Sequence, residues 1–142
     1  MIWIESSEQA RIDGILKASG GFPIGYSGGG SGGGILIVAS RLTGADTAVL
    51  SADGSNPSGT YGGPGGGGRI VVATGLTTTE RGRLLSGVPS RHFAATHPVF
   101  QGATSVAPAS VGPDYTDEEW RTPQPGSVLF ITSAGGTILL VR

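Results

Sequence analysis

The sequence contains no cysteine and a single lysine, Lys17, among its 142 residues. The absence of cysteine excludes a disulfide framework and thiolate metal sites. Long apolar runs are also missing: the longest stretches, residues 35–39 and 138–141, are far too short to cross a membrane. Charge of either sign is scarce and balanced, with 9 Lys and Arg against 10 Asp and Glu and no basic stripe. We therefore expect neither nucleic-acid binding nor membrane insertion.

The N-terminal residues, MIWIESSEQ, lack the basic start and the long apolar run of a secretory signal peptide. We expect that a role outside the cell would require delivery as part of a larger polypeptide, or inside a virion released by lysis.

Glycine is abundant, with 27 residues, and it is patterned. Residues 15–40 repeat without a gap as residues 49–74, at an offset of 34, and twelve of the 26 aligned positions are identical. Seven of these are glycine; the others are Leu16/Leu50, Ala18/Ala52, Pro23/Pro57, Val38/Val72 and Ala39/Ala73. A fixed period of this size indicates stacked structural units, none of which can bury its apolar face alone.

Each unit holds two short runs rich in Ile, Val, Leu and Thr and bounded by Gly, Pro, Asn or Ser, which predicts strands. The first strand lies near residues 12–18, 46–52 and 80–86; the second lies near 2–6, 35–40, 69–74 and 128–133, and a last apolar run covers 137–142. We expect one domain over residues 1–142, with repeats at about 15–48 and 49–82 and partial units at both ends.

Equivalent strands that recur in one direction must pair in parallel. The predicted fold is therefore all-β: a right-handed parallel β-helix, or β-solenoid, with a repeat of about 34 residues. The offset predicts one buried column of Leu16, Leu50 and Leu84 and another of Ile4, Val38, Val72 and Ile131. The second strand is apolar at consecutive positions, so both of its faces need a cover. The cover could be the Gly-rich segments, an insertion or another subunit.

The Gly-rich connectors, residues 25–34 and 59–68, have equal length in both copies. We expect them to stack as extended helices of three residues per turn, with a flexible linker as the alternative. The third unit departs from the period, because the best match to its second strand, residues 128–133, arrives about 25 residues late. We place an insertion of that length within residues 88–126, where the connector would be. A capping box at Thr116 and Glu119 predicts a short helix over 117–121.

These motifs carry a resemblance. The run GGGSGGG, the SADG turn at 51–54 and GGGGRIVV at 65–72 resemble the glycine-rich parallel β-helix repeats of bacterial surface and adhesin-like proteins, and similar segments of phage tail-fibre proteins. The likeness covers residues 12–76 well, 128–133 weakly and 88–126 not at all. It implies a structural or adhesive role and supplies no catalytic residues.

The sequence offers little for catalysis. Polysaccharide lyases and hydrolases need several converging carboxylates, and on the expected solenoid wall the only pair in register is Asp46 with Glu80. His92 and His97 could serve as metal ligands, but polar loop residues are the simpler interpretation. No nucleophile elbow and no phosphate loop is present. We expect no enzyme activity, cofactor or metal.

The insertion is the part of the chain that does not match the repeat, and long loops on a rigid scaffold commonly carry function. Aromatic and arginine side chains dominate contact surfaces. The candidate contact surface therefore consists of Arg91, Phe93, Phe100, Tyr115, Trp120 and Arg121. The alternative is that Phe93, Phe100 and Trp120 simply cover the outer face of the second strand.

The predicted function is a non-catalytic structural or adhesive module of an extracellular fibre or virion, of the phage tail-fibre or surface-adhesin type. The alternative is a glycan-binding or glycan-cleaving β-helix protein. We expect localisation outside the cell or on a virion surface. Expected partners are further copies of the chain, as a homo-oligomer and most simply a trimer, or other fibre subunits, with a cell-surface glycan as a further candidate.

Overall fold

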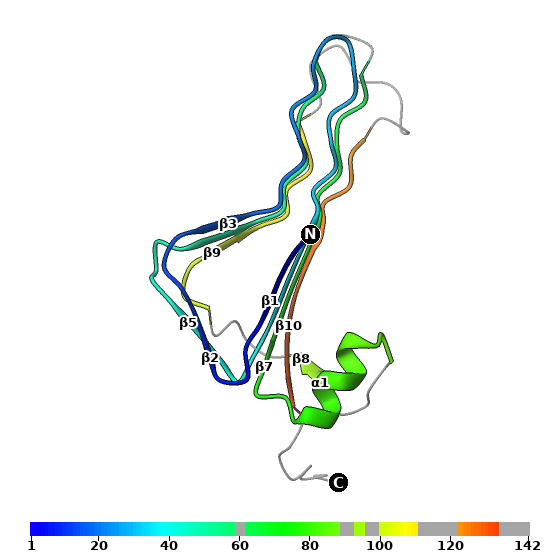
Figure 1. Ribbon diagram of the computed structural model, residues 1–142. Helices are drawn as coiled ribbons and strands as arrows, with labels where there is room; N and C mark the ends of the chain where they lie inside the picture. Colours follow the sequence, from blue (N-terminus) through cyan, green and yellow to red (C-terminus); the bar gives the residue numbers. More distant parts are fainter. Residues whose placement is uncertain (59–61, 89–92, 96–99, 111–121, 134–142) are drawn as a thin grey trace, which may run out of the picture.

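The computed structural model describes residues 1–58, 62–88, 93–95, 100–110 and 122–133. It contains three small sheets of short strands, which form the sides of a triangular outline, and a long limb that projects from one corner (Figure 1). Sheet A has the strand order β1-β4-β7-β10-β8, sheet B the order β2-β5 and sheet C the order β3-β6-β9. The strands are β1 (Ile2–Glu5), β2 (Gln9–Ile12), β3 (Ile15–Lys17), β4 (Gly34–Ala39), β5 (Arg41–Gly44), β6 (Val49–Ser51), β7 (Arg69–Thr74), β8 (Phe93–Ala95), β9 (Ala103–Ser105) and β10 (Ser127–Ser133).

The chain passes through the sheets in successive rows. Row 1 covers residues 1–33, row 2 covers 34–68, row 3 covers 69–126, and β10 lies above row 3. Every pairing between equivalent strands of consecutive rows is parallel: β1 with β4, β4 with β7, β7 with β10, β2 with β5, β3 with β6 and β6 with β9. The expected parallel pairing of equivalent strands in successive repeats is thus confirmed.

The prediction of an all-β right-handed β-solenoid is wrong. The described residues form separate small sheets of five, two and three short strands, and sheet B ends after row 2. Strand β8 pairs antiparallel with β10, so sheet A is mixed. Residues 80–86, expected as a third copy of the first strand, lie largely in helix α1 (Thr78–Leu85) instead.

Helix α1 forms because Thr77 and Glu80 make a capping box. The Thr77 hydroxyl accepts from the backbone N–H of Glu80, and the Glu80 carboxylate accepts from the backbone N–H of Thr77 at 2.9 Å. A hydrogen bond at each end of the motif satisfies donors that a helix start leaves free. Helical spacing then replaces strand spacing, and Leu84 joins the helix rather than a column with Leu16 and Leu50.

The predicted register is correct between β3 and β6 of sheet C and wrong in sheet A. Leu16 lies opposite Leu50, as expected, but the third member of that column is Thr104. In sheet A, Ile4 lies opposite Ile37, Ile37 opposite Val72, and Val72 opposite Phe130. Val38 and Ile131 belong to the neighbouring column, on the other face. A shift of one residue moves a side chain to the opposite face of a sheet, which is why the error matters.

Two apolar clusters lie on the two faces of sheet A. The inner cluster fills the space between the sheets and includes Ile35, Ile37, Leu50, Ile70 and Val72, each at most 1% exposed. The outer cluster contains Val38, Ala73, Leu76 and Ile131, with Leu84 and Leu85 of α1 packed against it. The consecutive apolar residues of the sheet A strands predicted that both faces are covered. Helix α1 covers part of the outer face.

The helix also ties distant rows together. The Arg81 guanidinium donates to the backbone carbonyl of Ser6, just after β1, at 2.7 Å and lies 3.7 Å from the carboxylate of Glu5, the last residue of β1. The Ser133 hydroxyl, at the end of β10, donates to Glu80 at 2.9 Å. One helix thus contacts the first and the last strand of the parallel stack.

The extra length of the third repeat lies elsewhere than expected. Residues 40–48 lead from β4 to β6, whereas residues 75–102 lead from β7 to β9 and contain α1 and β8. The segment of row 3 between β9 and β10, residues 106–126, is close in length to the Gly-rich connectors of rows 1 and 2. The predicted helix over 117–121 and the last apolar run over 137–142 lie outside the described residues.

Candidate functional site: a glycine-rich arm and an open strand edge

The projecting limb, here called the arm, consists of one outward and one returning segment per row (Figure 1). Its described residues are 18–33 in row 1, 52–58 and 62–68 in row 2, and 106–110 and 122–126 in row 3. Within row 1, the two segments pair at intervals of three residues. Gly33 N–H donates to Ala18 at 2.7 Å, Gly30 N–H donates to Gly21 at 3.3 Å, and the Ser27 hydroxyl donates to Ile24 at 2.9 Å. Row 2 repeats the spacing, from Gly68 to Ala52 and from Gly65 to Ser55. A three-residue interval matches extended helices of three residues per turn.

Neighbouring rows of the arm are joined in the same way. Gly29 N–H donates to Gly63 and Gly32 N–H donates to Gly66, each at 2.8 Å, between rows 1 and 2. Gly67 N–H donates to Gln124 at 2.9 Å, between rows 2 and 3. Because these extended segments make no internal ladder, the bonds between segments satisfy their backbone groups. The expected ordered stacking of the connectors is confirmed for the described residues.

Glycine is required where the segments approach most closely. A Cβ atom added to Gly32 would lie 2.0 Å from the Ala52 carbonyl oxygen, and one added to Gly126 would meet the Gly68 carbonyl at 1.8 Å. No side chain fits at such distances. The glycine content thus results from packing backbone against backbone.

The tip of the arm exposes apolar side chains. Phe22 is 76% exposed, Ile24 is 94% exposed and Tyr26 is 84% exposed, all in row 1. Exposed apolar groups gathered on a rigid support commonly mark contact surfaces. This cluster, here called the tip cluster, was not singled out in the sequence. Its signal was available, because Phe22, Tyr26 and Tyr61 are the only aromatic residues in the Gly-rich segments of rows 1 and 2.

Asp53 fixes the base of the arm. Its carboxylate accepts from the Ser51 hydroxyl at 2.6 Å, from the Ser105 hydroxyl, and from the Ala107 N–H at 2.8 Å. The Ser19 hydroxyl accepts from the Asp53 N–H at 3.2 Å and shares a hydrogen bond with Ser51 at 2.9 Å. The network therefore joins rows 1, 2 and 3 where the sheet ends and the arm begins.

These contacts set the protonation of Asp53. Burial acts to raise the pKa of the carboxyl, but the hydrogen bonds from Ser105, Ser51 and Ala107, together with the charge of Lys17, outweigh it and lower the pKa below the ordinary 3.8. A carboxylate with a lowered folded-state pKa stabilises the fold above the ordinary value, and that contribution is lost as the pH falls through the lowered pKa.

We expect the substitution Asp53→Asn to decrease the free energy of unfolding at pH 7 by about 1–3 kcal/mol, the usual range for hydrogen bonds to a charged group. It should also flatten the loss of stability below pH 4. Urea unfolding from pH 2.5 to pH 7 measures both effects. Asp46→Asn, at an exposed turn, is the matched control and should change neither. Equal acid sensitivity of the wild type and Asp53→Asn would contradict this role of the carboxylate.

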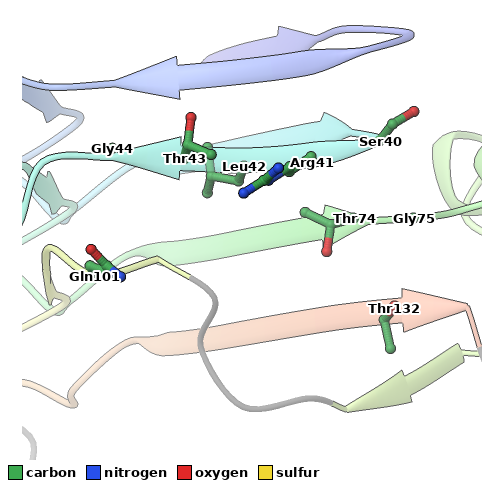
Figure 2. A pocket seen from close by; sticks show the side chains of 9 residues that line it. All are labelled: Ser40, Arg41, Leu42, Thr43, Gly44, Thr74, Gly75, Gln101 and Thr132. Carbon is green, nitrogen blue, oxygen red and sulfur yellow. The ribbon is translucent and has the colours of Figure 1, made fainter.

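A second feature lies at the free edge of β5. A groove of about 640 Å³ is open to solvent there (Figure 2). Polar side chains dominate its wall, and Arg41 is its one cation. The lining residues are Ser40, Arg41, Leu42, Thr43, Gly44, Thr74, Gly75, Gln101 and Thr132.

The predicted contact surface is only partly described. Phe100 is 4% exposed and belongs to the inner core cluster, where its ring lies against Gly44 and Gly102. Phe93 lies in β8, at the edge of sheet A. The other four residues lie outside the described residues: Arg91, Tyr115, Trp120 and Arg121. Phe100 is therefore a core residue rather than part of a contact surface. It packs on the inner side of the sheets and not on the outer face that the alternative interpretation named.

The groups considered for chemistry are not brought together. Asp46 lies at the turn between β5 and β6, whereas Glu80 lies in α1 and binds Thr77 and Ser133. Across the described segments, no three His, Asp or Glu residues gather in a way that could hold a metal ion. His92 and His97 lie outside those segments. Likewise, none of the described helices is long and apolar enough to span a membrane.

The sequence was compared with protein-family models, with curated proteins and with solved structures, and none of these comparisons gave a match.

Proposed function

We propose that this chain is a non-catalytic structural and adhesive module of an extracellular fibre or virion surface, in which a rigid arm presents an apolar tip. The observation that carries the proposal is the tip cluster of Phe22, Ile24 and Tyr26, exposed at the end of a limb whose backbone is hydrogen-bonded between rows. An ordered limb loses little conformational entropy when its tip is bound, which favours contact with a partner.

The exposed aromatic rings also favour a glycan as the partner of the tip, since aromatic faces offer large apolar contact area with little flexibility. A glycan-binding protein is therefore the second candidate function. It differs from the first in the partner rather than in the mechanism.

The row 1 strands supply a second surface for the proposed assembly. Strands β1, β2 and β3 are each the terminal strand of a sheet, and Met1, Trp3 and Ile15 are 87%, 53% and 69% exposed beside them. Unpaired strand edges favour association. We place the contact with further copies of the chain, in a homo-oligomer such as a trimer, or with other fibre subunits, at this edge.

The tip is tested with the double substitution Phe22→Ser and Tyr26→Ser. We expect the wild type to bind bacterial cell surfaces or members of a glycan array, and the double variant to bind about tenfold or more weakly, as for the loss of contact hot spots. Folding should be unaffected because both side chains are exposed.

Leu129→Ser removes another exposed apolar side chain, on the outer face of sheet A, and is the matched control. Equal binding by the wild type and the tip variant would contradict the adhesive role. Turnover of the bound polysaccharide, measured with and without Ca²⁺, would contradict a non-catalytic module.

A further inference from the structure

Among the described residues, sheet B has no row 3 strand, whereas both neighbouring sheets have one. In row 3, β7 continues sheet A and β9 continues sheet C, but β5 has only β2 beside it. Row 3 leaves the stack just before β5. Gly75 N–H still donates to the carbonyls of Ala39 and Ser40, at 3.2 and 3.0 Å, and the chain then turns into α1.

Row 3 rejoins the stack just beyond β5. The Ala103 N–H donates to the Ala48 carbonyl at 2.9 Å, and β9 pairs with β6 from there. No described residue of row 3 pairs with the edge of β5 between these two points, over Arg41–Gly44, and the groove of Figure 2 lies along this edge.

A strand added here would occupy the position next to β5 in sheet B. Paired strands lie about 4.8 Å apart, and four residues of strand extend over roughly 13 Å. Equivalent strands of consecutive rows pair in parallel, so a strand that continues the pattern runs parallel to β5. In a parallel pair, alternate residues of a strand direct their N–H and C=O groups to each side. Half of these groups in β5 therefore face the groove.

The surroundings restrict the side chains of such a strand. On the inner side, Phe100 already fills the corner of the core and lies near Gly44, where an added Cβ would be 3.2 Å from the ring. Inward-facing residues of the added strand must therefore be small. On the outer side, Arg41 is exposed, and no carboxylate among the described residues pairs with it, in contrast to Arg11 and Arg81.

We propose that the groove binds an extended acidic segment of another polypeptide, which adds to β5 as a parallel strand with small residues facing inward and Asp or Glu beside Arg41. The backbone edge supplies the hydrogen bonds common to strand addition, and the cation supplies the preference for acid. The groove lies on the sheets rather than on the arm, so this interaction is separate from the proposed role of the tip.

The probe is a fluorescent six-residue peptide of alternating Ser and Asp, and the measurement is fluorescence anisotropy with the full chain. We expect it to bind about tenfold or more tightly than the same peptide with Lys in place of Asp. Two further peptides carry methyl groups on alternate backbone nitrogens, so that each lacks the N–H donors of one of its two edges. Only the edge that faces β5 needs its donors, so one of the two methylated peptides should lose binding. Equal binding of the Asp and Lys peptides, or of both methylated forms and the parent, would overturn the proposal.

Arg41→Gln should weaken binding of the Asp peptide by about threefold to tenfold and leave a peptide with Asn in place of Asp unaffected. Arg83→Gln, an exposed arginine of α1, is the matched control and should change nothing. Because the chain has no cysteine, Thr43→Cys allows a disulfide to a Cys-bearing peptide that reports its position.

Two other occupants would appear in the same experiments. Disulfide-linked dimers of Thr43→Cys that form without peptide would identify a second copy as the occupant and overturn the proposal. Peptide binding that appears only after Leu139→Asp and Leu140→Asp would identify the chain's own C-terminal residues instead, with the same consequence. Absence of binding in both forms of the chain would also overturn it.

Discussion

The substitution Gly32→Ala is expected to decrease the free energy of unfolding by about 3 kcal/mol or more. The added methyl group would lie 2.0 Å from the Ala52 carbonyl oxygen and 2.5 Å from the Gly68 nitrogen. Both atoms are backbone, and they form a hydrogen bond with each other at 2.7 Å. The arm can therefore accommodate the methyl only by separating two segments, which combines overpacking with broken hydrogen bonds.

The arm offers a graded series that distinguishes packing from a general glycine effect. At Gly33 the new Cβ would lie 3.1 Å from the Ala18 carbonyl, and at Gly21 it would meet nothing within 4 Å. None of these three positions has a positive φ. Urea unfolding should show a large loss for Gly32→Ala and a smaller one for Gly33→Ala. Gly21→Ala should be neutral or stabilising by up to about 1 kcal/mol, because alanine restricts the unfolded chain. Three equal changes would contradict the packing explanation.

The repeat predicts the fold well where the two copies have equal length. Leu16 and Leu50 are paired as the offset of 34 requires, and Asp53 lies over Ser19, which accepts a hydrogen bond from its N–H. Sheet A departs from this offset, since Ile2 pairs with Ile35 and Ile35 pairs with Ile70. The offset from Ile2 to Ile35 is one residue shorter than the period of 34, and the offset from Ile35 to Ile70 is one residue longer. A strand exchanges its faces at each such step, so a single offset could not give the correct columns.

The region after β7 shows a second limit. Residues 80–86 align with two strands, but the capping box of Thr77 and Glu80 starts a helix there, and Gly87, with φ +69°, follows its end. Local capping therefore overrides the alignment. Thr77 and Glu80 have the same spacing as Thr116 and Glu119, so this signal could be found in the sequence. Its consequence for β5 could not, because the groove depends on where row 3 leaves and rejoins the stack.

Leucine truncation measures how much the buried interior between the sheets contributes to stability. Leu50→Ala is expected to decrease the free energy of unfolding by about 2–5 kcal/mol, the range for fully buried leucine. Leu50 is 0% exposed and has a row on each side, with Leu16 opposite it in β3 and Thr104 opposite it in β9. The neighbouring rows are fixed by backbone hydrogen bonds, so they cannot collapse into the cavity.

The control is Leu129→Ala, because Leu129 lies on the outer face of sheet A and is 44% exposed. It should lose about 1 kcal/mol or less. The measurement is urea unfolding, and the two values are comparable if the dependence of the unfolding free energy on urea concentration equals that of the wild type. Equal losses at the two sites would show that the interior between the three sheets is not the stabilising core.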